Sequence, residues 1–321
     1  MKRILLLLWV CCYGIHSFAQ KEYFEGNLIY KVSFIPKVDN LSIKDVRKIL
    51  SMGEQLNTIA KDGNYRQTSE YSDVFTIRKD KKIYLKFRKI DTLYYVDFSF
   101  DTTQVTGIVK KDSIYKICNY PCKTITIKTS NITRQYYYTD SLRVNPEYDK
   151  DNAVSQFNIY SKETAGAVYL YTHIEYPFAF QTDSCIHVEK KSIDDHVFDL
   201  PPLPVEKFVF ASLHTTARFP GKEGAWSKYL GSNLDPKLSL KYVKISKDQS
   251  ESSVTALVEF VVGEDGSISN IQVVNKNEIH SKLAEEAARV IRESPRWLPA
   301  SFYGEKITSS VRQPVIFKVM R

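Results

Sequence analysis

The chain has 321 residues, of which 45 are Lys or Arg and 37 are Asp or Glu, so its formal net charge is +8. Hydrophobic residues make up 43% and charged residues 26%, which excludes a disordered chain, a collagen and a coiled coil. The length suggests about two domains. The 21 tyrosines, beside only 12 glycines, favour β-rich structure.

The first 19 residues have the pattern of a cleavable secretory signal peptide. Lys2 and Arg3 precede an apolar run over 4–13, and Ser17-Phe18-Ala19 is a small-x-small cleavage site. The run is shorter than the roughly 20 apolar residues that a membrane anchor needs. We therefore predict cleavage after Ala19, no transmembrane anchor after cleavage, and a periplasmic protein whose association with the envelope stays open.

The region 20–200 is predicted to be a curved antiparallel β-sheet with one or two helices. Ser42 can cap a helix over 43–52 that Gly53 ends, and a second helix is expected over 152–162. Alternating apolar and polar residues, the period of a sheet with one buried face, occur over 27–34, 82–87, 93–98 and 124–128.

Three prolines mark a domain boundary. Pro201, Pro202 and Pro204 lack the N–H that a central strand needs, and they favour an extended polyproline segment. We predict a linker over 201–206, followed by a second domain over 207–321.

The second domain is predicted to be a small α+β unit of two helices and a three-stranded antiparallel sheet. A short helix is expected over 223–230 and an amphipathic helix over 279–292, which Pro295 stops. Asp265-Gly266 is a hairpin signal between the first two strands. The three strands are expected over 255–262, 268–275 and 309–319.

The basic excess lies in this second domain, where 17 Lys and Arg stand against 12 Asp and Glu. The basic residues are dispersed and form no stripe interleaved with aromatic residues, so a nucleic-acid partner is not expected. A solvated surface with weak attraction to anionic partners is the expected consequence.

The sequence contains no constellation that catalysis would need. It has no HExxH, no nucleophile elbow, no phosphate-binding Gly-rich loop and no dinucleotide fingerprint. It also has no Cys/His cluster with zinc spacing. We therefore expect a non-catalytic protein with no metal and no cofactor.

Three cysteines remain after signal cleavage: Cys118, Cys122 and Cys185. Export permits disulfides, but an odd number leaves at least one thiol unpaired within the chain. The alternatives are a Cys118–Cys122 loop bridge, a Cys122–Cys185 bridge, or buried free thiols.

The second domain carries a series of family motifs. They are Ala217-Arg218-Phe219-Pro220-Gly221, Gly263-Glu264-Asp265-Gly266 after an apolar strand, the run 284–291, Pro295-Arg296-Trp297-Leu298-Pro299-Ala300, Gly304, and Gln313-Pro314-Val315-Ile316-Phe317-Lys318. In order and spacing they resemble the TonB C-terminal domain of Bacteroidetes-type proteins. We expect Gly266 to adopt a positive φ, and Trp297 and Phe317 to pack between helix and sheet.

This resemblance implies peptide binding in the context of TonB-dependent transport. TonB-like domains bind a segment of an outer-membrane transporter, which adds as a strand to the sheet edge through main-chain groups. The expected partner is therefore an outer-membrane transporter or another envelope protein, and a homodimer is a further option. The matching edge is the last strand, with Ser309, Ser310, Val311, Arg312, Gln313, Val315, Ile316 and Lys318.

The first domain carries shorter motifs, over 25–30, 117–123, 137–146 and 194–201. They resemble exported Bacteroidetes proteins of the GLPGLI and related families, which implies a lipoprotein-carrier-like curved sheet with helices in its concavity. An alternative function follows, namely a carrier or binding protein for a lipid or another hydrophobic ligand. Its aromatic-rich sheet would include Tyr84, Tyr94, Tyr95, Tyr136, Tyr137 and Tyr138.

Overall fold

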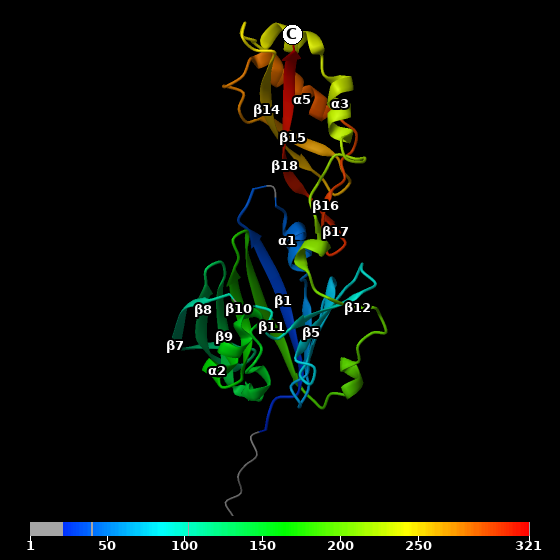
Figure 1. Ribbon diagram of the computed structural model, residues 1–321. Helices are drawn as coiled ribbons and strands as arrows, with labels where there is room; N and C mark the ends of the chain where they lie inside the picture. The colour runs from blue at the N-terminus through cyan, green and yellow to red at the C-terminus, as the bar shows by residue number, and fades with distance from the viewer. Residues whose placement is uncertain (1–21, 40, 102, 321) are drawn as a thin grey trace, which may run out of the picture.

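The computed structural model describes residues 22–39, 41–101 and 103–320. Their helices and strands form two units that lie end to end, the N-terminal one around a large curved sheet and the C-terminal one around small sheets (Figure 1). Within these residues, no helix is long and apolar enough to cross a bilayer. The predicted signal peptide, with its cleavage site at Ala19, lies outside the described residues.

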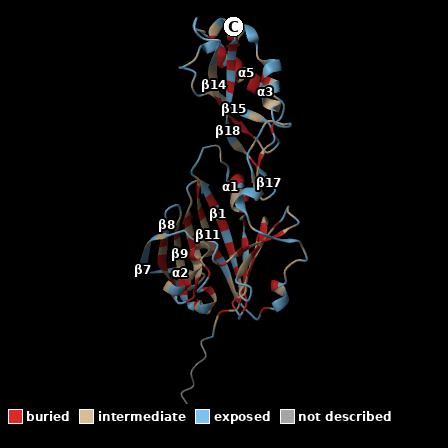
Figure 2. Ribbon diagram, viewed as in Figure 1, coloured by how far each residue is buried: buried red, intermediate tan, exposed pale blue. Residues whose placement is uncertain are grey.

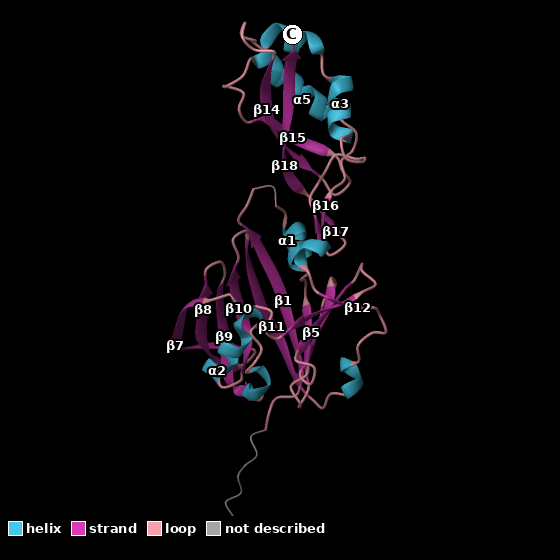
Figure 3. Cartoon of the chain, in the orientation of Figure 1, coloured by secondary structure: helices cyan, strands magenta, loops and turns pink. Residues whose placement is uncertain are grey.

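The N-terminal unit is built on one sheet of 12 strands, which confirms the predicted curved, β-rich first half (Figure 3). Its strands are β1 (Gly26–Pro36), β2 (Gln55–Ile59), β3 (Tyr65–Thr68), β4 (Ser72–Ile77), β5 (Lys82–Phe87), β6 (Leu93–Asp97), β7 (Val105–Ile117), β8 (Tyr120–Thr129), β9 (Thr133–Arg143), β10 (Ala167–Glu175), β11 (Ala179–Lys190) and β12 (Val205–Lys207). They follow the order β12-β6-β5-β4-β3-β2-β1-β11-β10-β9-β8-β7. Long-range pairing of β1 with β11 joins the two series of hairpins.

The strand β1 shows why this sequence folds into a sheet with one buried face. Leu28, Tyr30, Val32 and Phe34 are buried, and the residues between them are exposed (Figure 2). This period of two is the alternation of side chains on a strand. The apolar residues of β1 therefore face the concavity of the sheet, where the helices lie.

Two helices cover part of this buried face. In α1 (Ile43–Leu50), Val46 belongs to the same apolar cluster as Val32 and Phe34 of β1. In α2 (Phe157–Thr164), the ring of Tyr160 lies 4.6 Å from that of Tyr136 in β9, measured between centroids. The rest of the concave face, between the two helices, borders a cavity.

The ends of both helices differ in part from the predictions. Ser42 caps α1 as predicted, since its Oγ accepts a hydrogen bond from Asp45 N at 3.1 Å. However, α1 ends at Leu50, because Ser51 takes the left-handed conformation with φ 53°, so Gly53 does not end it. The second helix begins at Phe157, since Gln156 has a φ of 59° after the 3-10 turn η2 (Val154–Gln156).

The proline-rich segment runs along the edge of the large sheet. Leu93 N of β6 donates to Pro204 O at 2.8 Å, and residues 205–207 then form β12, which is parallel to β6. A proline carbonyl can accept a hydrogen bond although its nitrogen cannot donate one, so an edge position suits it. The end of the segment predicted as a linker is therefore a strand of the first sheet.

The C-terminal unit has two three-stranded sheets. The predicted one has the order β15-β14-β18, with β14 (Glu251–Val262), β15 (Ile268–Val273) and β18 (Ser309–Met320). The other was not predicted and consists of β13 (His214–Thr215), β16 (Ala300–Phe302) and β17 (Glu305–Ile307).

Helices α3 (Ala225–Asn233) and α5 (Ser281–Arg292) correspond to the two predicted helices of the C-terminal unit. A third helix, α4 (Pro236–Tyr242), lies between them and was not predicted. Asp235 caps α4, since its Oδ1 accepts from Lys237 N at 2.9 Å. Proline at the first helical position suits this start, because no intrahelical N–H is lost there.

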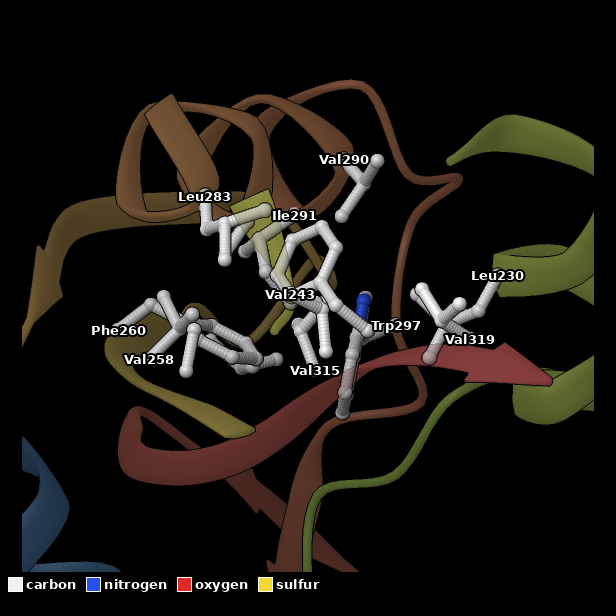
Figure 4. Close-up of a cluster of buried hydrophobic side chains, with 14 residues drawn as sticks. Leu230, Val243, Val258, Phe260, Leu283, Val290, Ile291, Trp297, Val315 and Val319 are labelled. Carbon is white, nitrogen blue, oxygen red and sulfur yellow. The ribbon is translucent and has the colours of Figure 1, made fainter. Parts of the chain in front are cut away.

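A single apolar core holds α5 against the β15-β14-β18 sheet. Trp297 packs edge-on against Phe260 with a centroid distance of 4.9 Å, and its Nε1 donates to Ser294 Oγ at 3.0 Å. The predicted packing of Trp297 and Phe317 between helix and sheet is confirmed. The core residues include Val258, Phe260, Leu283, Val290, Ile291, Trp297 and Val315, which are labelled in Figure 4. Phe317 belongs to the same core.

The two units meet through α1 and the β16–β17 hairpin. Phe87 of β5 stacks on Tyr303 at the tip of that hairpin, with a centroid distance of 4.3 Å and an interplanar angle of 6°. Polar contacts also join the two units. Lys48 Nζ forms an ion pair with Glu264 at 2.8 Å and donates to Lys306 O at 2.7 Å, and Thr308 N donates to Asp45 Oδ1 at 3.1 Å. All of these contacts lie at one end of the β15-β14-β18 sheet.

Cys118, Cys122 and Cys185 lie together as free thiols, so the structure contains neither of the two disulfides that the sequence allows. Cys118, in the turn between β7 and β8, donates its Sγ hydrogen to Cys185 O at 3.0 Å. Cys122 and Cys185 are buried in one apolar cluster with Leu28 and Tyr30. Burial raises the pKa of Cys122 to about 11 and that of Cys185 to about 12.

Gly266 provides a test of the turn between β14 and β15. Its φ is +82°, as predicted, and a Cβ built there would lie 2.2 Å from Trp297 O. Gly266→Ala should therefore lower the free energy of unfolding by about 1–3 kcal/mol. Gly231→Ala in α3 is the matched control, since a Cβ there meets open space, and it should raise stability by up to about 1 kcal/mol.

Urea unfolding followed by tryptophan fluorescence measures both variants, because Trp226 and Trp297 lie in the C-terminal unit. Equal stability of the two variants would contradict the close approach of Gly266 to Trp297.

The cysteine cluster predicts ordered thiol reactivity in the folded protein. Iodoacetamide should modify the half-buried Cys118 well before Cys122 and Cys185, since burial and a raised pKa leave little reactive thiolate at pH 8. Peptide mapping by mass spectrometry measures the three rates separately, and in urea they should become similar. A disulfide-linked Cys122–Cys185 peptide in the purified protein would contradict this arrangement.

Candidate functional site

The strand β18 is an edge strand of the C-terminal sheet. Among the described residues it pairs with β14 along its whole length, from Val262↔Ser309 to Glu251↔Met320, and no second strand pairs with it. The contacts with the N-terminal unit involve residues before Ser309, and β18 runs away from that unit (Figure 1). The N-terminal unit therefore lies at the end of β18 and not along its edge.

The direction of the main-chain groups on this edge follows from the neighbouring strand. Leu257 N donates to Asn275 Oδ1, and Leu257 O accepts from Val274 N, both at 2.9 Å, so both groups of Leu257 point away from β18. Leu257 is paired with Pro314, and this pair is thus a non-hydrogen-bonded one. The main-chain nitrogen and oxygen of Pro314 consequently face the free edge.

Pro314 interrupts the row of donors on this edge. The nitrogen of a proline carries no hydrogen, so an added strand finds an acceptor but no donor at this position. Proline is one of the residues by which natural sheets limit pairing at an edge. Pro314 is absent from the predicted edge residues, although a proline inside a strand pattern is itself a sign of an edge strand.

The alternation along β18 sorts the predicted edge residues into two sets. Ser310, Arg312, Ile316 and Lys318 share the parity of Pro314, so their main-chain groups face the free edge and their side chains are exposed. Ser309, Val311, Gln313 and Val315 direct their main-chain groups to β14 and their side chains to the core side. The structure thus places half of the predicted residues on the edge and the other half inside the domain.

The exposed face of β18 combines ion pairs with apolar side chains. Arg312 pairs with Glu259 of β14 at 2.9 Å. Ile316 and Met320, with 51% and 69% of their surface exposed, are large apolar residues on the same face. A strand added at this edge would therefore meet apolar side chains beside charges that are already paired.

A second candidate site is a cavity of about 420 Å³ in the concavity of the large sheet. Paired residues of neighbouring strands form two rows across its floor. One row is Leu28-Asn57-Gln67-Val74-Leu85, and the other is Ile59-Tyr65-Thr76-Ile83-Val96. The volume falls in the range of roughly 300–1,000 Å³ that small-molecule sites have.

The other side of the cavity comes from β9, β10 and β11, with α2 above it. Tyr136, Thr172 and Asp183 are paired across these three strands and all line the cavity, as do Phe157 and Tyr160 of α2. Of the six tyrosines predicted for the ligand-binding sheet, Tyr136 lines the cavity and the other five do not. The tyrosines that line it instead are Tyr30, Tyr65, Tyr160, Tyr169 and Tyr176.

All six tyrosines lie in the large sheet, as predicted, and strand parity explains why a tyrosine such as Tyr84 does not line the cavity. Tyr84 stands between Ile83 and Leu85, which line the cavity, so it points to the other face of β5. There its ring packs against that of Tyr95 at a centroid distance of 6.4 Å. Aromatic content alone therefore did not reveal which face encloses the cavity.

Burial dominates the electrostatics of the cavity. The carboxylate of Asp183 accepts hydrogen bonds from Thr172 Oγ1 and Gln181 Nε2, both at 2.8 Å. Its pKa is nevertheless raised, because burial outweighs these two bonds, and burial likewise raises the pKa of Tyr136 to about 12. The part of the chain that the structure describes holds no group of three or more His, Cys, Asp or Glu suited to a metal ion.

Comparison with solved structures finds low similarity. A structure of PNGF-II matches with a TM-score of 0.36 and 10% identity over 74% of this chain, which spans 43% of that chain. An uncharacterized conserved protein from Thermus thermophilus has a TM-score of 0.31 and 8% identity, covering 57% of this chain and 91% of that chain. The Pseudomonas aeruginosa MucA/MucB complex has a TM-score of 0.28 and 6% identity, covering 76% of this chain and 77% of that chain.

These TM-scores are too low for any of the three likenesses to assign a fold or a function. No curated protein matches the chain. The resemblance of the first domain to GLPGLI proteins stays a prediction.

The family comparison concerns the unit that contains β18. Residues 240–319 match the family model described as the Gram-negative bacterial TonB protein C-terminal. The match includes β14, β15, α5 and nearly all of β18, which are the elements that form the core and the free edge. This family implies a role in TonB-dependent envelope transport. Residues 240–319 therefore match the TonB C-terminal family, as the sequence motifs predicted.

Proposed function

We propose that the C-terminal unit binds an extended segment of an outer-membrane transporter, or of another envelope protein, by strand addition to β18. The partner would pair with the main-chain groups of Ser310, Arg312, Ile316 and Lys318, and its side chains would lie beside Ile316 and Met320. Such pairing uses main-chain hydrogen bonds for affinity and neighbouring side chains for specificity. The protein would act in the periplasm, without catalysis.

The observation that carries this proposal is the free edge of β18 within a TonB C-terminal domain. The hydrogen bonds from α1 to the C-terminal unit involve Lys306 and Thr308, which precede the edge strand, and this supports an accessible edge. An edge that is uncovered along most of a 12-residue strand offers enough length for a peptide of several residues.

A second candidate function is the binding of a hydrophobic small molecule by the N-terminal unit. The cavity of about 420 Å³ supports it, because two cross-strand rows of mostly apolar side chains line its floor. The two functions occupy different units and do not exclude each other.

Ile316→Pro tests strand addition directly. The Ile316 N–H faces the free edge, so proline there removes a second donor without breaking the ladder to β14. Affinity for the partner peptide should fall at least about fivefold, since the lost hydrogen bond and the proline ring both oppose the added strand. Ile316→Ala keeps the N–H and is the matched control, which should lose less.

The measurement is fluorescence polarisation of the full protein with peptides tiled across the periplasmic N-terminal segments of outer-membrane transporters. Equal losses in Ile316→Pro and Ile316→Ala would show that the side chain and not the main chain binds the peptide. If no peptide binds the unmodified protein, the proposed function is wrong.

Pro314→Val should change affinity in the opposite direction. Valine restores a donor in the middle of the free edge and has high β propensity, so a peptide that binds there should gain about two- to tenfold in affinity, the value of one hydrogen bond. The same polarisation assay measures the gain. Unchanged affinity in Pro314→Val would place the bound peptide away from the centre of β18.

A further inference from the structure

Several buried polar atoms, on side chains that line the cavity, have no hydrogen-bond partner in the structure. They are Gln55 Nε2, Asn57 Oδ1, Asn152 Oδ1 and Ser161 Oγ, and each of these residues is less than 5% exposed. An unpaired buried polar group costs about 1–3 kcal/mol. Four such groups around one cavity are therefore a reason to look for a ligand that completes their hydrogen bonds.

The four groups come from two opposite sides of the cavity. Gln55 and Asn57 are two residues apart on β2, so they lie on the same face of the floor. Asn152, two residues before η2, and Ser161 of α2 line the cavity from residues 152–164, which we call the η2–α2 region. Both pairs thus belong to residues that line the same cavity.

The chemistry of these atoms restricts the polar group. The amide oxygens of Asn57 and Asn152 accept hydrogen bonds, so they need a donor from the ligand, whereas the amide nitrogen of Gln55 needs an acceptor. A carboxylate can only accept and an ammonium group can only donate. A hydroxyl or a carboxamide does both.

The charges of the cavity wall also favour a ligand with an uncharged head. Arg78 and Arg134 stand against Asp149 and Asp183, so the formal charge of the lining is zero. Arg78 and Asp149 form an ion pair, and Arg134 and Asp183 both act electrostatically on Tyr136. Arg134 would therefore attract an anionic head that Asp183 repels. Asp183 would attract a cationic head that Arg134 repels.

The remaining lining suits a hydrocarbon body. Val74, Leu85, Ile83 and Val96 lie on adjacent strands of the floor at one end of both cross-strand rows. Burying a hydrocarbon chain there gains about 25 cal/mol per Å² of apolar surface. The four unpaired polar atoms lie elsewhere, on β2 and in the η2–α2 region, so they are separated from this apolar part of the wall.

We propose that the cavity binds a neutral amphiphile, with its hydrocarbon chain over β4–β6 and with an uncharged, hydroxyl- or amide-bearing head between β2 and the η2–α2 region. This inference rests on the second candidate function above and specifies the ligand class. It is independent of the peptide edge on β18.

Three probes that share a ten-carbon chain test the ligand class: 1-decanoylglycerol, decanoate and decylammonium. Isothermal titration of the delipidated full protein, below the critical micelle concentrations, should show decanoylglycerol binding at least tenfold more tightly than the other two. Binding of decanoate or decylammonium with equal or higher affinity leaves the ligand-binding function standing and overturns the neutral head. If none of the three binds, both the second candidate function and this inference are wrong.

Asn57→Leu tests the position of the head. The change removes an unpaired acceptor and keeps the γ-branched shape of the side chain, so decanoylglycerol should bind at least fivefold more weakly while the thermal stability of the ligand-free protein stays equal or rises. Unchanged decanoylglycerol binding, with or without a loss of stability, would give Asn57 a packing role and overturn the placement of the head.

Val74→Trp tests the position of the chain by filling the floor of the cavity. It should abolish binding of decanoylglycerol, whereas the same change at the exposed Val109 on β7 should leave binding intact. Circular dichroism checks that both variants are folded, and if Val74→Trp is not, Leu85→Phe replaces it as a smaller filling change. Full binding by a folded filling variant would overturn the placement of the chain.

Discussion

The alternation along a β-strand fixes the direction of the side chains and the direction of the main-chain hydrogen-bonding groups at the same time. From one residue to the next, the side chain changes face and the main-chain N–H and C=O change side together. In β18 this parity sends Val315 and Phe317 into the core and leaves the main-chain groups of Pro314 and Ile316 on the free edge. In the large sheet the same parity puts Asn57 on the cavity floor. Both candidate sites thus depend on register, because a slip of one residue would exchange the faces.

The features that depend on residues close together in the sequence could be predicted from local sequence patterns. The apolar spacing of α5, the Asp265-Gly266 turn and the core position of Trp297 could all be read from neighbouring residues. Helix α4 could not, because it has seven residues and Leu240 on it is 68% exposed, so it shows no clear apolar stripe. The cavity could not either, since its floor joins residues from Leu28 to Val96 that meet only through the pairing of six strands.

The aromatic side chain of Phe208 lies close to residues of both units. Phe208 lines the cavity, and its ring also lies 6.4 Å from that of Tyr303 in the C-terminal unit and 6.1 Å from that of Phe100, measured between centroids. Tyr303 in turn stacks on Phe87. A ligand that moves Phe208 must therefore change packing at the junction of the two units, and by linkage a change at the junction must alter the affinity of the cavity by the same free energy.

Pro314 has a further consequence when two copies of the chain are considered. Two β18 strands that pair with each other around a twofold axis would both present a proline, so two carbonyl groups would lack a donor. A partner peptide without proline loses only one hydrogen bond to the same edge. At about 1 kcal/mol for each bond, this difference favours a foreign strand over a second copy several-fold. The residue that weakens the edge thus also discriminates in favour of unlike partners.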